Sequence, residues 1–597
     1  MKKQLLIIAL ILTLLLGTAC GKTSSGGEGG SRLNISQSDW NEVDHHNFDK
    51  VSQSPTFTID KNAEECKIGM VPFAFFSDGM VLQRNAVNRV YGFCDYDGGV
   101  AVEIDGKIYY GSAADGEFEV YLPPVAEGEN LTMTIYGKSN KVTVRDVCYG
   151  EVLLFSGQSN MNWRMTDTIS GTWPNETPGK QFLSYYGVVA TPYVPTLEND
   201  PQTYYEYIYT KELADTYRAK AEGAIEPDEN IRLMLLENYY PQDKIAQNKT
   251  PRKDYDLDKK WQKADTRGAI LECSMFAYYF VKNLRAFTGV PVGIIVASFG
   301  ATDTSAWVDR QTYENNKAVF PDIGDSTVFA NSVSSCYNTF IAPMLGYKFR
   351  SFIWYQGEGE CSGANYGAAF SALVNSYRET ADNPNMKVLV VSLPQFGNGA
   401  RYPAGYSQSN YGTADKELGM ENGIQTYGRA NQQKLPEIIE NCAVSVSVNT
   451  GDFDDIHPSD KEQISYQAAC SYLADLYGFK DVVLLYPAVS EVAITDELVR
   501  ISFENLGDGL QVRNNGIGFQ VSENGKDYIQ TRGVQEGDSI VLRASAAGIE
   551  TINYIRYGWL QFPRISRTDA EKYVSVFNSY GMPLDQFEIC VADWNRK

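Results

Sequence analysis

The sequence predicts an α/β protein with a parallel sheet in its middle and antiparallel β regions on either side. Three changes of pattern along the chain support this architecture. From about 70 to 148, apolar and polar residues alternate in short segments between turns, as in VAVEIDGKIYYGSAADGEFEVYL. From about 149, apolar strands are separated by helical stretches, which favours a parallel sheet with crossover helices. From about 480, the alternating pattern returns.

The elements of the middle region can be predicted in order. The predicted strands are 152–155, 292–297, 351–354, 388–393 and 443–448, and the predicted helices are 272–286, 366–380, 427–440 and 461–476. In the first helix, Phe276, Phe280 and Leu284 recur every four residues, which is typical of a core-facing stripe. A tyrosine-rich insertion at about 165–262 separates the first two strands. Its side chains suit either stacking on sugar rings or packing on their own domain.

These patterns predict several domains, because 597 residues exceed what one hydrophobic core usually organises. We expect an amino-terminal β domain at 66–148, the α/β domain at 149–478 and a β-sandwich-like domain at 479–597.

Composition excludes some classes of function. Asp and Glu number 74 against 52 Lys and Arg, a formal charge of -22, and no basic stretch is interleaved with aromatic residues. Nucleic acid is therefore not an expected partner, because neutralising phosphates needs clustered cations. The nine cysteines after Cys20 form no C-x-x-C pair, so neither a zinc ribbon nor thioredoxin-like chemistry is indicated. No metal and no organic cofactor is expected.

The first twenty residues, MKKQLLIIALILTLLLGTAC, combine two lysines, an apolar run and small residues before Cys20. This pattern predicts a signal peptide at 1–20. Gly17 to Cys20 resembles the lipobox of bacterial lipoproteins, so Cys20 is a candidate for lipidation, with simple secretion as the alternative. Residues 21–65 begin with GKTSSGGEGGS and are predicted to form a flexible tether and the lead-in to the first domain. We expect an exported protein at the periplasm or cell surface, attached to the membrane only through such a lipid anchor.

Chemically useful groups follow four of the predicted strands. Ser159 follows the first strand, Gly300 the second, and Gln356 with Glu358 the third, while Asp454 and Asp455 precede His457 after the last. Ligands of open parallel sheets bind beyond the carboxyl ends of the strands. These residues are therefore expected to meet at one edge of the sheet.

Histidine is the most informative residue type in the chain. It occurs only at His45 and His46, in the predicted tether, and at His457. A serine nucleophile needs a neighbouring base, and the base needs a carboxylate to orient it, so His457 is the candidate base. The sequence lacks G-x-S-x-G, which excludes the nucleophile elbow of α/β hydrolases.

Four motifs in order carry a family resemblance. GEVLLFSGQSNMNW, SFGATDTSAW, IWYQGE and DDIHPSDK resemble the sialate O-acetylesterase family of carbohydrate esterases, a branch of the SGNH hydrolases. The resemblance covers roughly 70 to 597, apart from the insertion. It implies a flavodoxin-like three-layer SGNH hydrolase domain flanked by antiparallel β domains.

The resemblance also implies roles for individual residues. Ser159 would be the nucleophile and His457 the general base. The oxyanion hole would consist of the backbone amides of Ser159 and Gly300 and the side chain of Gln356. Three acids compete to orient the imidazole: Asp454 has the D-x-x-H spacing of SGNH hydrolases, Glu358 belongs to the Q-G-E motif, and Asp455 is the aspartate of D-I-H-P.

The expected function is a serine esterase that removes O-acetyl groups from sugars, with an acetylated glycan as its partner. The chain departs from the family pattern at Ala301, where glycine is usual, and at Glu360, where an amide is usual. These departures leave open an esterase for other acetylated polysaccharides such as xylan. An inactive surface glycan-binding lipoprotein is the alternative from another class. Neither the oligomeric state nor any disulfide pairing follows from the sequence.

Overall fold

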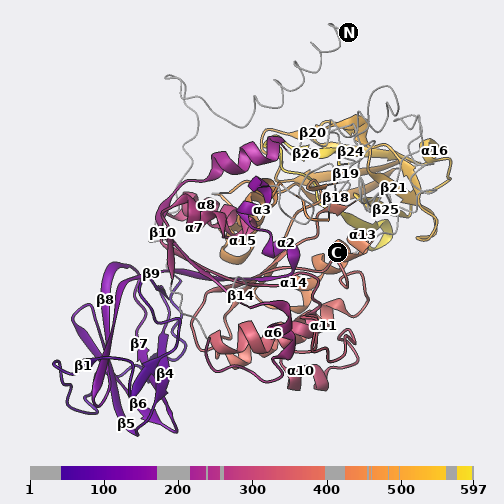
Figure 1. Ribbon diagram of the computed structural model, residues 1–597. Coiled ribbons are helices and arrows are strands. Elements are labelled where there is room, and N and C mark those ends of the chain that lie inside the picture. Colours follow the sequence, from indigo (N-terminus) through magenta and orange to yellow (C-terminus); the bar gives the residue numbers. More distant parts are fainter. Residues whose placement is uncertain are drawn as a thin grey trace, which may run out of the picture. The chain divides into compact units, whose positions relative to one another are not determined.

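The computed structural model describes residues 42–170, 215–236, 240–255, 261–396, 424–452, 456–458, 460–481, 483–495, 498–559 and 574–594 (Figure 1). Cys20, Asp454, Asp455 and most of the tyrosine-rich insertion lie outside these residues. In the ranges that are described, no helix has both the length and the apolar composition needed to cross a bilayer.

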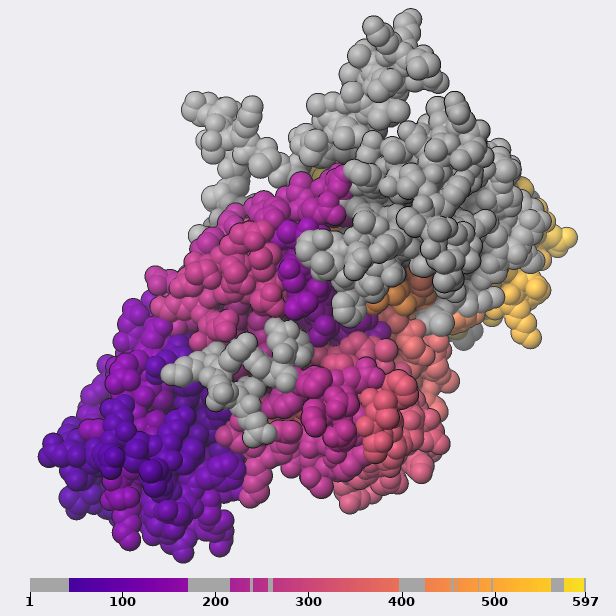
Figure 2. Space-filling model, viewed as in Figure 1, coloured from indigo at the N-terminus to yellow at the C-terminus, as the bar shows by residue number. Residues whose placement is uncertain are grey.

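A first antiparallel sheet is formed by the alternating segments at the start of the described chain. Its strands follow the order β9-β8-β5-β6-β7-β4-β2. They are β2 (Met70–Pro72), β4 (Asn88–Cys94), β5 (Gly98–Ile104), β6 (Lys107–Ala114), β7 (Glu117–Leu122), β8 (Gly128–Tyr136) and β9 (Asn140–Gly157). In β7, Phe118, Val120 and Leu122 are buried and the residues between them are only partly buried. Figure 2 shows the residues of this sheet, coloured indigo to purple, gathered in one part of the surface.

Strand β9 is shared between two sheets. Its first half pairs antiparallel with β8, and its second half pairs parallel with two strands of the main sheet, from Glu151 to Gly157. Burial follows this change, because every residue from Val147 to Gly157 is buried whereas the earlier ones alternate. A strand covered on both faces needs apolar residues at consecutive positions.

The main sheet has the order β11-β10-β12-β9-β13-β14-β16. Its further strands are β10 (Asp228–Leu235), β11 (Gln262–Ala264), β12 (Val292–Ser298), β13 (Ser351–Tyr355), β14 (Lys387–Val391) and β16 (Cys442–Ser445). All neighbours are parallel except β10 and β11. The five predicted strands thus all form, and they lie in the order 2-1-3-4-5.

Strand β10 corrects the prediction of one uninterrupted insertion between the first two strands. Residues 231–235 pair in register with β12, so that Leu233 lies opposite Ile294. The run Ile231 to Leu235 is buried because it extends the main sheet by one strand. The strand pattern of this short run could not be distinguished from the tyrosine-rich residues around it.

Helices lie on both faces of the main sheet (Figure 1). Leu153 and Phe155 of β9 pack in one apolar core with α8 (Met275–Thr288) and α15 (Glu462–Tyr477). Val152 and Leu154 point the other way, into a core that includes α11 (Tyr366–Thr380). Consecutive side chains of a strand point to opposite faces, so each strand contributes to both cores.

Two helices differ in their limits from the prediction for local physical reasons. Helix α8 begins after Ser274, whose hydroxyl accepts a hydrogen bond from the amide of Ala277, and it ends before Gly289, which has a φ of 70°. The predicted helix 427–440 is instead two helices, α13 (Ile424–Gln433) and α14 (Leu435–Ile438). The helix breaks just before Pro436, because proline has no backbone N–H to donate to the preceding turn.

The carboxyl-terminal β region has a core of its own. One sheet contains β18 (Ala488–Thr495), β19 (Leu498–Glu504), β24 (Ser539–Arg543) and β23 (Val534–Glu536). Another contains β22 (Ile529–Thr531), β21 (Phe519–Ser522), β25 (Tyr554–Tyr557) and β27 (Phe587–Cys590), and β20 (Leu510–Val512) pairs with β26 (Val576–Asn578). Ile501, Val521 and Ile555 share one apolar cluster. Residues of all three sheets pack in this cluster, so they bury one common core.

The segment from Glu42 to Glu65 is held against the folded chain. The amide of Asp44 donates to the carbonyl of Asn85 at 2.7 Å, and His46 Nε2 lies 2.7 Å from a carboxylate oxygen of Asp382. Further along, β1 (Glu64–Glu65) pairs with β9. The described part of the predicted tether and lead-in is therefore attached to the folded chain, because its acidic and histidine side chains find partners there.

Short elements complete the description. They are η1 (Phe48–Lys50), β3 (Val81–Gln83), α2 (Ser159–Asn162), α3 (Met165–Ser170), α6 (Gln242–Gln247), α7 (Arg267–Leu271), α9 (Thr304–Trp307), α10 (Arg310–Asn315), η2 (Tyr337–Ile341), η3 (Ala342–Met344), β15 (Gln395–Phe396), β17 (Gly451–Asp452), η6 (Asn514–Gly516), α16 (Ala544–Ala547) and α17 (Val591–Trp594).

Candidate active site

Ser159 lies directly beyond the carboxyl end of the central strand β9. The strand ends at Gly157, which has a φ of 134°. A Cβ atom on Gly157 would lie 2.2 Å from the carbonyl oxygen of Tyr355, so only glycine fits here. The chain then turns and begins the short helix α2 at Ser159, which is partly exposed. The sharp turn therefore presents the serine hydroxyl at the edge of the sheet.

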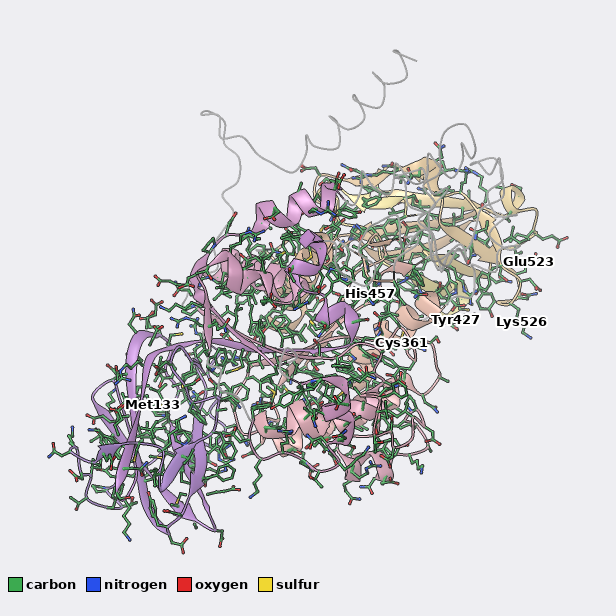
Figure 3. All side chains as sticks on the ribbon, viewed as in Figure 1. Met133, Cys361, Tyr427, His457, Glu523 and Lys526 are labelled. Atoms are coloured by element: carbon green, nitrogen blue, oxygen red, sulfur yellow. The ribbon has the colours of Figure 1, made fainter. Side chains whose placement is uncertain are left out.

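His457 lies against this serine. Its Nε2 atom is 2.7 Å from Ser159 Oγ, although the two residues are 298 positions apart in the chain. The imidazole also stacks on the indole of Trp163, with ring centroids 5.4 Å apart and an interplanar angle of 23°. Figure 3 shows His457 next to α2. This is the arrangement in which an imidazole can take the proton of a serine nucleophile.

The turn after β12 lies beside the same serine. A Cβ atom on Gly300 would be 3.4 Å from the Cβ of Ser159, and the amide of Phe299 donates to the carbonyl of Gly157 at 3.0 Å. Ala301 has a left-handed φ of 55° and is exposed, so its methyl group does not pack into the protein. Gly300 is therefore adjacent to Ser159, as the sequence predicted.

The side-chain amide of Gln356 donates its hydrogen bonds to other protein groups and not toward a substrate. It is fully buried, and its Nε2 donates to the carbonyl of Thr302 at 3.2 Å and to Glu360 Oε1 at 2.6 Å. Both N–H groups of the side-chain amide are thus used inside the protein. This geometry does not support the prediction that Gln356 donates to an oxyanion.

Of the three candidate acids, the structure describes Glu358 alone. Its carboxylate accepts hydrogen bonds from the side-chain amides of Gln158 and Asn160, the latter at 2.5 Å. Among the described residues its hydrogen bonds do not include the ring of His457. Asp454 and Asp455 lie outside the described residues. Glu358 therefore binds both neighbours of the nucleophile instead of orienting the imidazole.

Glu360 is a second carboxylate near the site. It accepts hydrogen bonds from the amide of Thr304 at 2.6 Å, from the Thr304 hydroxyl at 2.8 Å and from Gln356. Burial, followed by the nearby charge of Asp303, raises the pKa of Glu360 to about 7, and these hydrogen bonds oppose the shift only in part. Glu360 thus joins the loop after β13 to the loop after β12.

Comparisons with known proteins agree with this geometry. A sequence model of the family described as carbohydrate esterase, sialic acid-specific acetylesterase, matches residues 237–426. The sialate O-acetylesterase of Rattus norvegicus is 21% identical over 503 residues, which cover 75% of this chain and 78% of the relative. The sialate O-acetylesterase of Homo sapiens is 21% identical over 398 residues, covering 64% of this chain and 62% of the relative. These matches support a member of the sialate O-acetylesterase family.

A solved structure extends the comparison to the fold. The crystal structure of a carbohydrate acetylesterase from Xanthomonas citri superimposes with a TM-score of 0.63 at 23% identity. The superposition covers 87% of this chain and 99% of that chain. The two proteins share an α/β fold with flanking antiparallel sheets.

Two residues of this site were missed by sequence reasoning. Asn160 Nδ2 donates to Glu358 and, at 2.9 Å, to the carbonyl of Ile456, while its Oδ1 accepts from Lys461 Nζ. Asn160 and Lys461 are both fully buried. Asn160 stands in the motif GQSN and Lys461 in the motif HPSDK, but nothing in the spacing of the two motifs indicated that these side chains touch.

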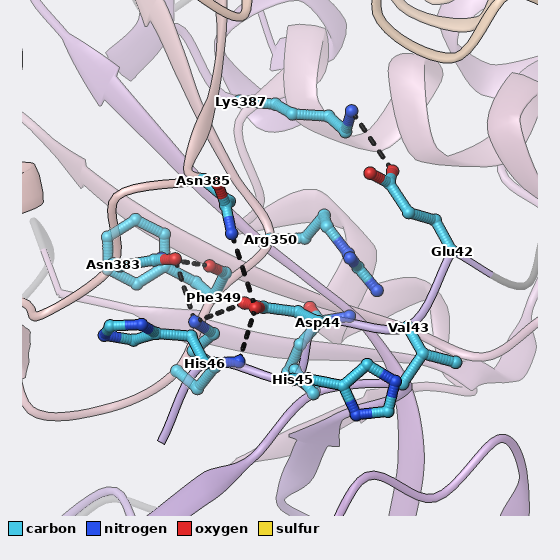
Figure 4. A pocket seen from close by; sticks show the side chains of 13 residues that line it. Glu42, Val43, Asp44, His45, His46, Phe349, Arg350, Asn383, Asn385 and Lys387 are labelled. Carbon is cyan, nitrogen blue, oxygen red and sulfur yellow. Dashed lines mark hydrogen bonds and ion pairs between the residues drawn. The ribbon is translucent and has the colours of Figure 1, made fainter. Parts of the chain in front are cut away.

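A separate pocket of about 370 Å³ lies away from this chemistry (Figure 4). Arg350 precedes β13 and Lys387 begins β14, so the pocket is at the amino ends of the strands whereas Ser159 is at the carboxyl end. Its lysines pair with the segment described above: Lys348 with Asp44 at 2.8 Å and Lys387 with Glu42 at 3.3 Å. The pocket therefore serves the attachment of residues 42–46 and is not part of the active site.

The part of the chain that the structure describes contains no disulfide and no cluster of potential metal ligands. There, no three His, Cys, Asp or Glu side chains are placed to hold a metal ion. The nine cysteines from Cys66 to Cys590 are all free thiols.

Proposed function

We propose that this protein is a serine esterase that removes O-acetyl groups from sugars, in the manner of a sialate O-acetylesterase. The observation that carries this proposal is the 2.7 Å contact between Ser159 Oγ and His457 Nε2 at the carboxyl end of the sheet. The family match and the names of the relatives, which are sialate O-acetylesterases, support an acetylated sugar as substrate.

The reaction follows from the geometry in two halves. Ser159 Oγ attacks the acetyl carbonyl carbon while His457 takes the hydroxyl proton. The amides of Ser159 and Gly300 stabilise the negative charge on the carbonyl oxygen. When the intermediate collapses, the C–O bond to the sugar breaks and His457 returns its proton to the sugar oxygen. A water molecule, deprotonated by His457, then attacks the acetyl-serine, and acetate leaves as Ser159 regains its proton.

Asp454 is the acid that we propose orients the imidazole. Its D-x-x-H spacing fits that role, and Glu358, its nearest competitor, is engaged by Gln158 and Asn160. Asp455 is the remaining alternative. In this arrangement the carboxylate would hold one tautomer of His457 and stabilise the imidazolium that forms.

The finer fold assignment rests on strand order. We propose that the domain is a flavodoxin-like three-layer SGNH hydrolase. The order β12-β9-β13-β14-β16 corresponds to 2-1-3-4-5, which is the flavodoxin order, with β10 and β11 added at one edge.

Export and lipidation at Cys20 remain part of the proposal. The apolar run before Cys20 and the lipobox-like Gly17 to Cys20 support a lipoprotein at the periplasm or cell surface. A Cys20→Ser variant should then move from the membrane fraction to the soluble exported fraction. An unchanged distribution would favour simple secretion.

The decisive experiment measures acetate released from a model acetyl ester. Ser159→Ala and His457→Ala should each lower kcat by about a thousandfold or more. Ser156→Ala is the matched control, because this buried hydroxyl on the strand that leads to Ser159 has no hydrogen-bond partner in the described residues. Wild-type activity in Ser159→Ala would refute the esterase assignment.

Substrate choice needs a second measurement with the wild-type enzyme. Acetate release from acetylated sialosides should exceed release from acetylated xylan. The reverse order would favour the xylan alternative. Release from neither substrate, nor from the model ester, would favour a glycan-binding protein without catalysis.

A further inference from the structure

We propose that Asn160, held between the buried charges of Glu358 and Lys461, is the positioning residue that keeps Ser159 and His457 in contact. This inference rests on the proposed function, since it concerns how that active site is assembled. It assigns Glu358 and Lys461 a role in positioning and not in proton transfer.

Asn160 touches both loops that must meet. It directly follows Ser159, and its Nδ2 donates to the carbonyl of Ile456, the residue before His457, at 2.9 Å. The nucleophile and the base are thus each one residue away from the two ends of this hydrogen bond. The side chain of Asn160 is fully buried, so water does not compete for the bond.

Two oppositely charged side chains fix the amide of Asn160. Glu358 accepts from its Nδ2 at 2.5 Å, and Lys461 donates to its Oδ1. Since one oxygen faces a cation and the nitrogen faces an anion, the amide cannot flip without losing both bonds. Glu358 also accepts from Gln158, so it holds the residue on each side of Ser159.

The burial of these charges makes them interdependent. Glu358 is 8% exposed and Lys461 is 0% exposed. Lys461 also lies over the ring of Tyr355, 5.3 Å from its centroid. A buried ion without its counter-charge is costly, whereas removing both members of a pair is often tolerated. Glu358 and Lys461 are therefore expected to compensate each other through Asn160.

The three side chains come from separate parts of the chain. Asn160 is in α2, Glu358 follows β13, and Lys461 caps the start of α15, four residues after His457. Reacting groups misplaced by 1 Å can lose about a hundredfold in rate. Loss of this network should therefore impair the chemical step more than substrate binding.

The test compares Glu358→Gln, Lys461→Met and the double variant in the full chain. Each single change should lower kcat about 10- to 100-fold with KM within about threefold. The rate at which a fluorophosphonate inactivates the enzyme should fall in parallel, because it reports the reactivity of Ser159 directly. The double variant should lose no more than the worse single variant, because both side chains act through the same amide of Asn160.

Two further variants keep the test falsifiable. Asn160→Ala removes no charge and should lower kcat and the inactivation rate about as much as the single charge changes. Lys220→Met is the matched control, because Lys220 pairs at 3.2 Å with Asp460, next to Lys461, but its side chain is 46% exposed. It should change kcat less than about twofold.

Several outcomes would overturn the inference. Losses that multiply in the double variant would show that Glu358 and Lys461 act independently, as expected if Glu358 itself orients the imidazole. Wild-type kcat in Asn160→Ala would exclude the positioning role. A Ser159→Ala variant run alongside separates the two proposals: if it keeps wild-type activity, the proposed function itself fails.

Discussion

At the scale of single residues, backbone conformation explains how the two loops approach each other. Gly157 must be glycine, because any Cβ would collide with Tyr355. Ala301, in contrast, adopts a left-handed φ of 55° where the family pattern has glycine, and its side chain is exposed. A non-glycine residue in this region costs about 1–2 kcal/mol. The loop beside Ser159 thus keeps its left-handed conformation although residue 301 is alanine and not glycine.

Glu360 leads to a prediction about pH. Its pKa is raised to about 7 by burial and Asp303, from an ordinary value of 4.5. Between these values the folded protein binds a proton that the unfolded chain has lost, so stability falls as the pH rises from about 4.5 to 7. The full shift corresponds to roughly 3 kcal/mol.

Glu360→Gln should remove this dependence. Glutamine can keep the bonds to Thr304 and Gln356 without a charge, so the variant should match the wild type near pH 4.5 and be more stable at pH 8. Urea unfolding at the two pH values measures the difference. A constant difference between variant and wild type across this range would contradict the assigned pKa.

At the scale of elements, packing of α8 against the sheet gives a second prediction. Phe280 is fully buried between the helix and the sheet, whereas Phe329 is 62% exposed. Phe280→Ala should lower the free energy of unfolding by about 3–5 kcal/mol, because it leaves a cavity. Phe329→Ala should change it by less than about 0.5 kcal/mol. Urea unfolding followed by circular dichroism compares the two, and equal losses would refute the assigned packing.

Element types were predictable where periodicity was long and undisturbed. The helix predicted at 366–380 is α11, with the same limits. The stripe of Phe276, Phe280 and Leu284 is fully buried, as predicted. Strand β10 was missed because five buried residues inside a tyrosine-rich stretch carry too little periodicity to distinguish a strand from a packed loop.

At the scale of the whole molecule, a buried ion network lies where β9 passes between its two sheets. Glu151 is 1% exposed and accepts a hydrogen bond from Gln83 at 3.0 Å. Its carboxylate lies 3.4 Å from Nε of Arg350 and 4.0 Å from Nε of Arg84. Burial opposes the charge on Arg350, but Glu151, together with Tyr477, Tyr472 and Glu42, more than offsets this and raises the pKa of that guanidinium.

Glu151→Gln should destabilise the protein by about 3–5 kcal/mol, because it leaves buried arginines without their anion. The control is Glu119→Gln, which breaks the surface pair with Arg89 at 2.9 Å and should cost less than about 1 kcal/mol. Thermal unfolding, followed by both tryptophan fluorescence and circular dichroism, measures the two effects. Similar shifts for both variants would show that the network does not stabilise this junction.

The pattern of the chain alone was enough to predict the long, regularly periodic elements, and it indicated that Ser159, Gly300 and His457 follow strands of one parallel sheet. Burial of a strand or helix on one or both faces produces a periodic pattern of apolar residues in the sequence, and the order of the motifs identifies which residues stand at strand ends. Only the tertiary structure decided that Glu358 binds the neighbours of Ser159, that Gln356 is held by Glu360, and that Asn160 joins the serine turn to the histidine loop. Such contacts depend on sheet order and on the geometry of loops hundreds of residues apart, for which no local pattern exists.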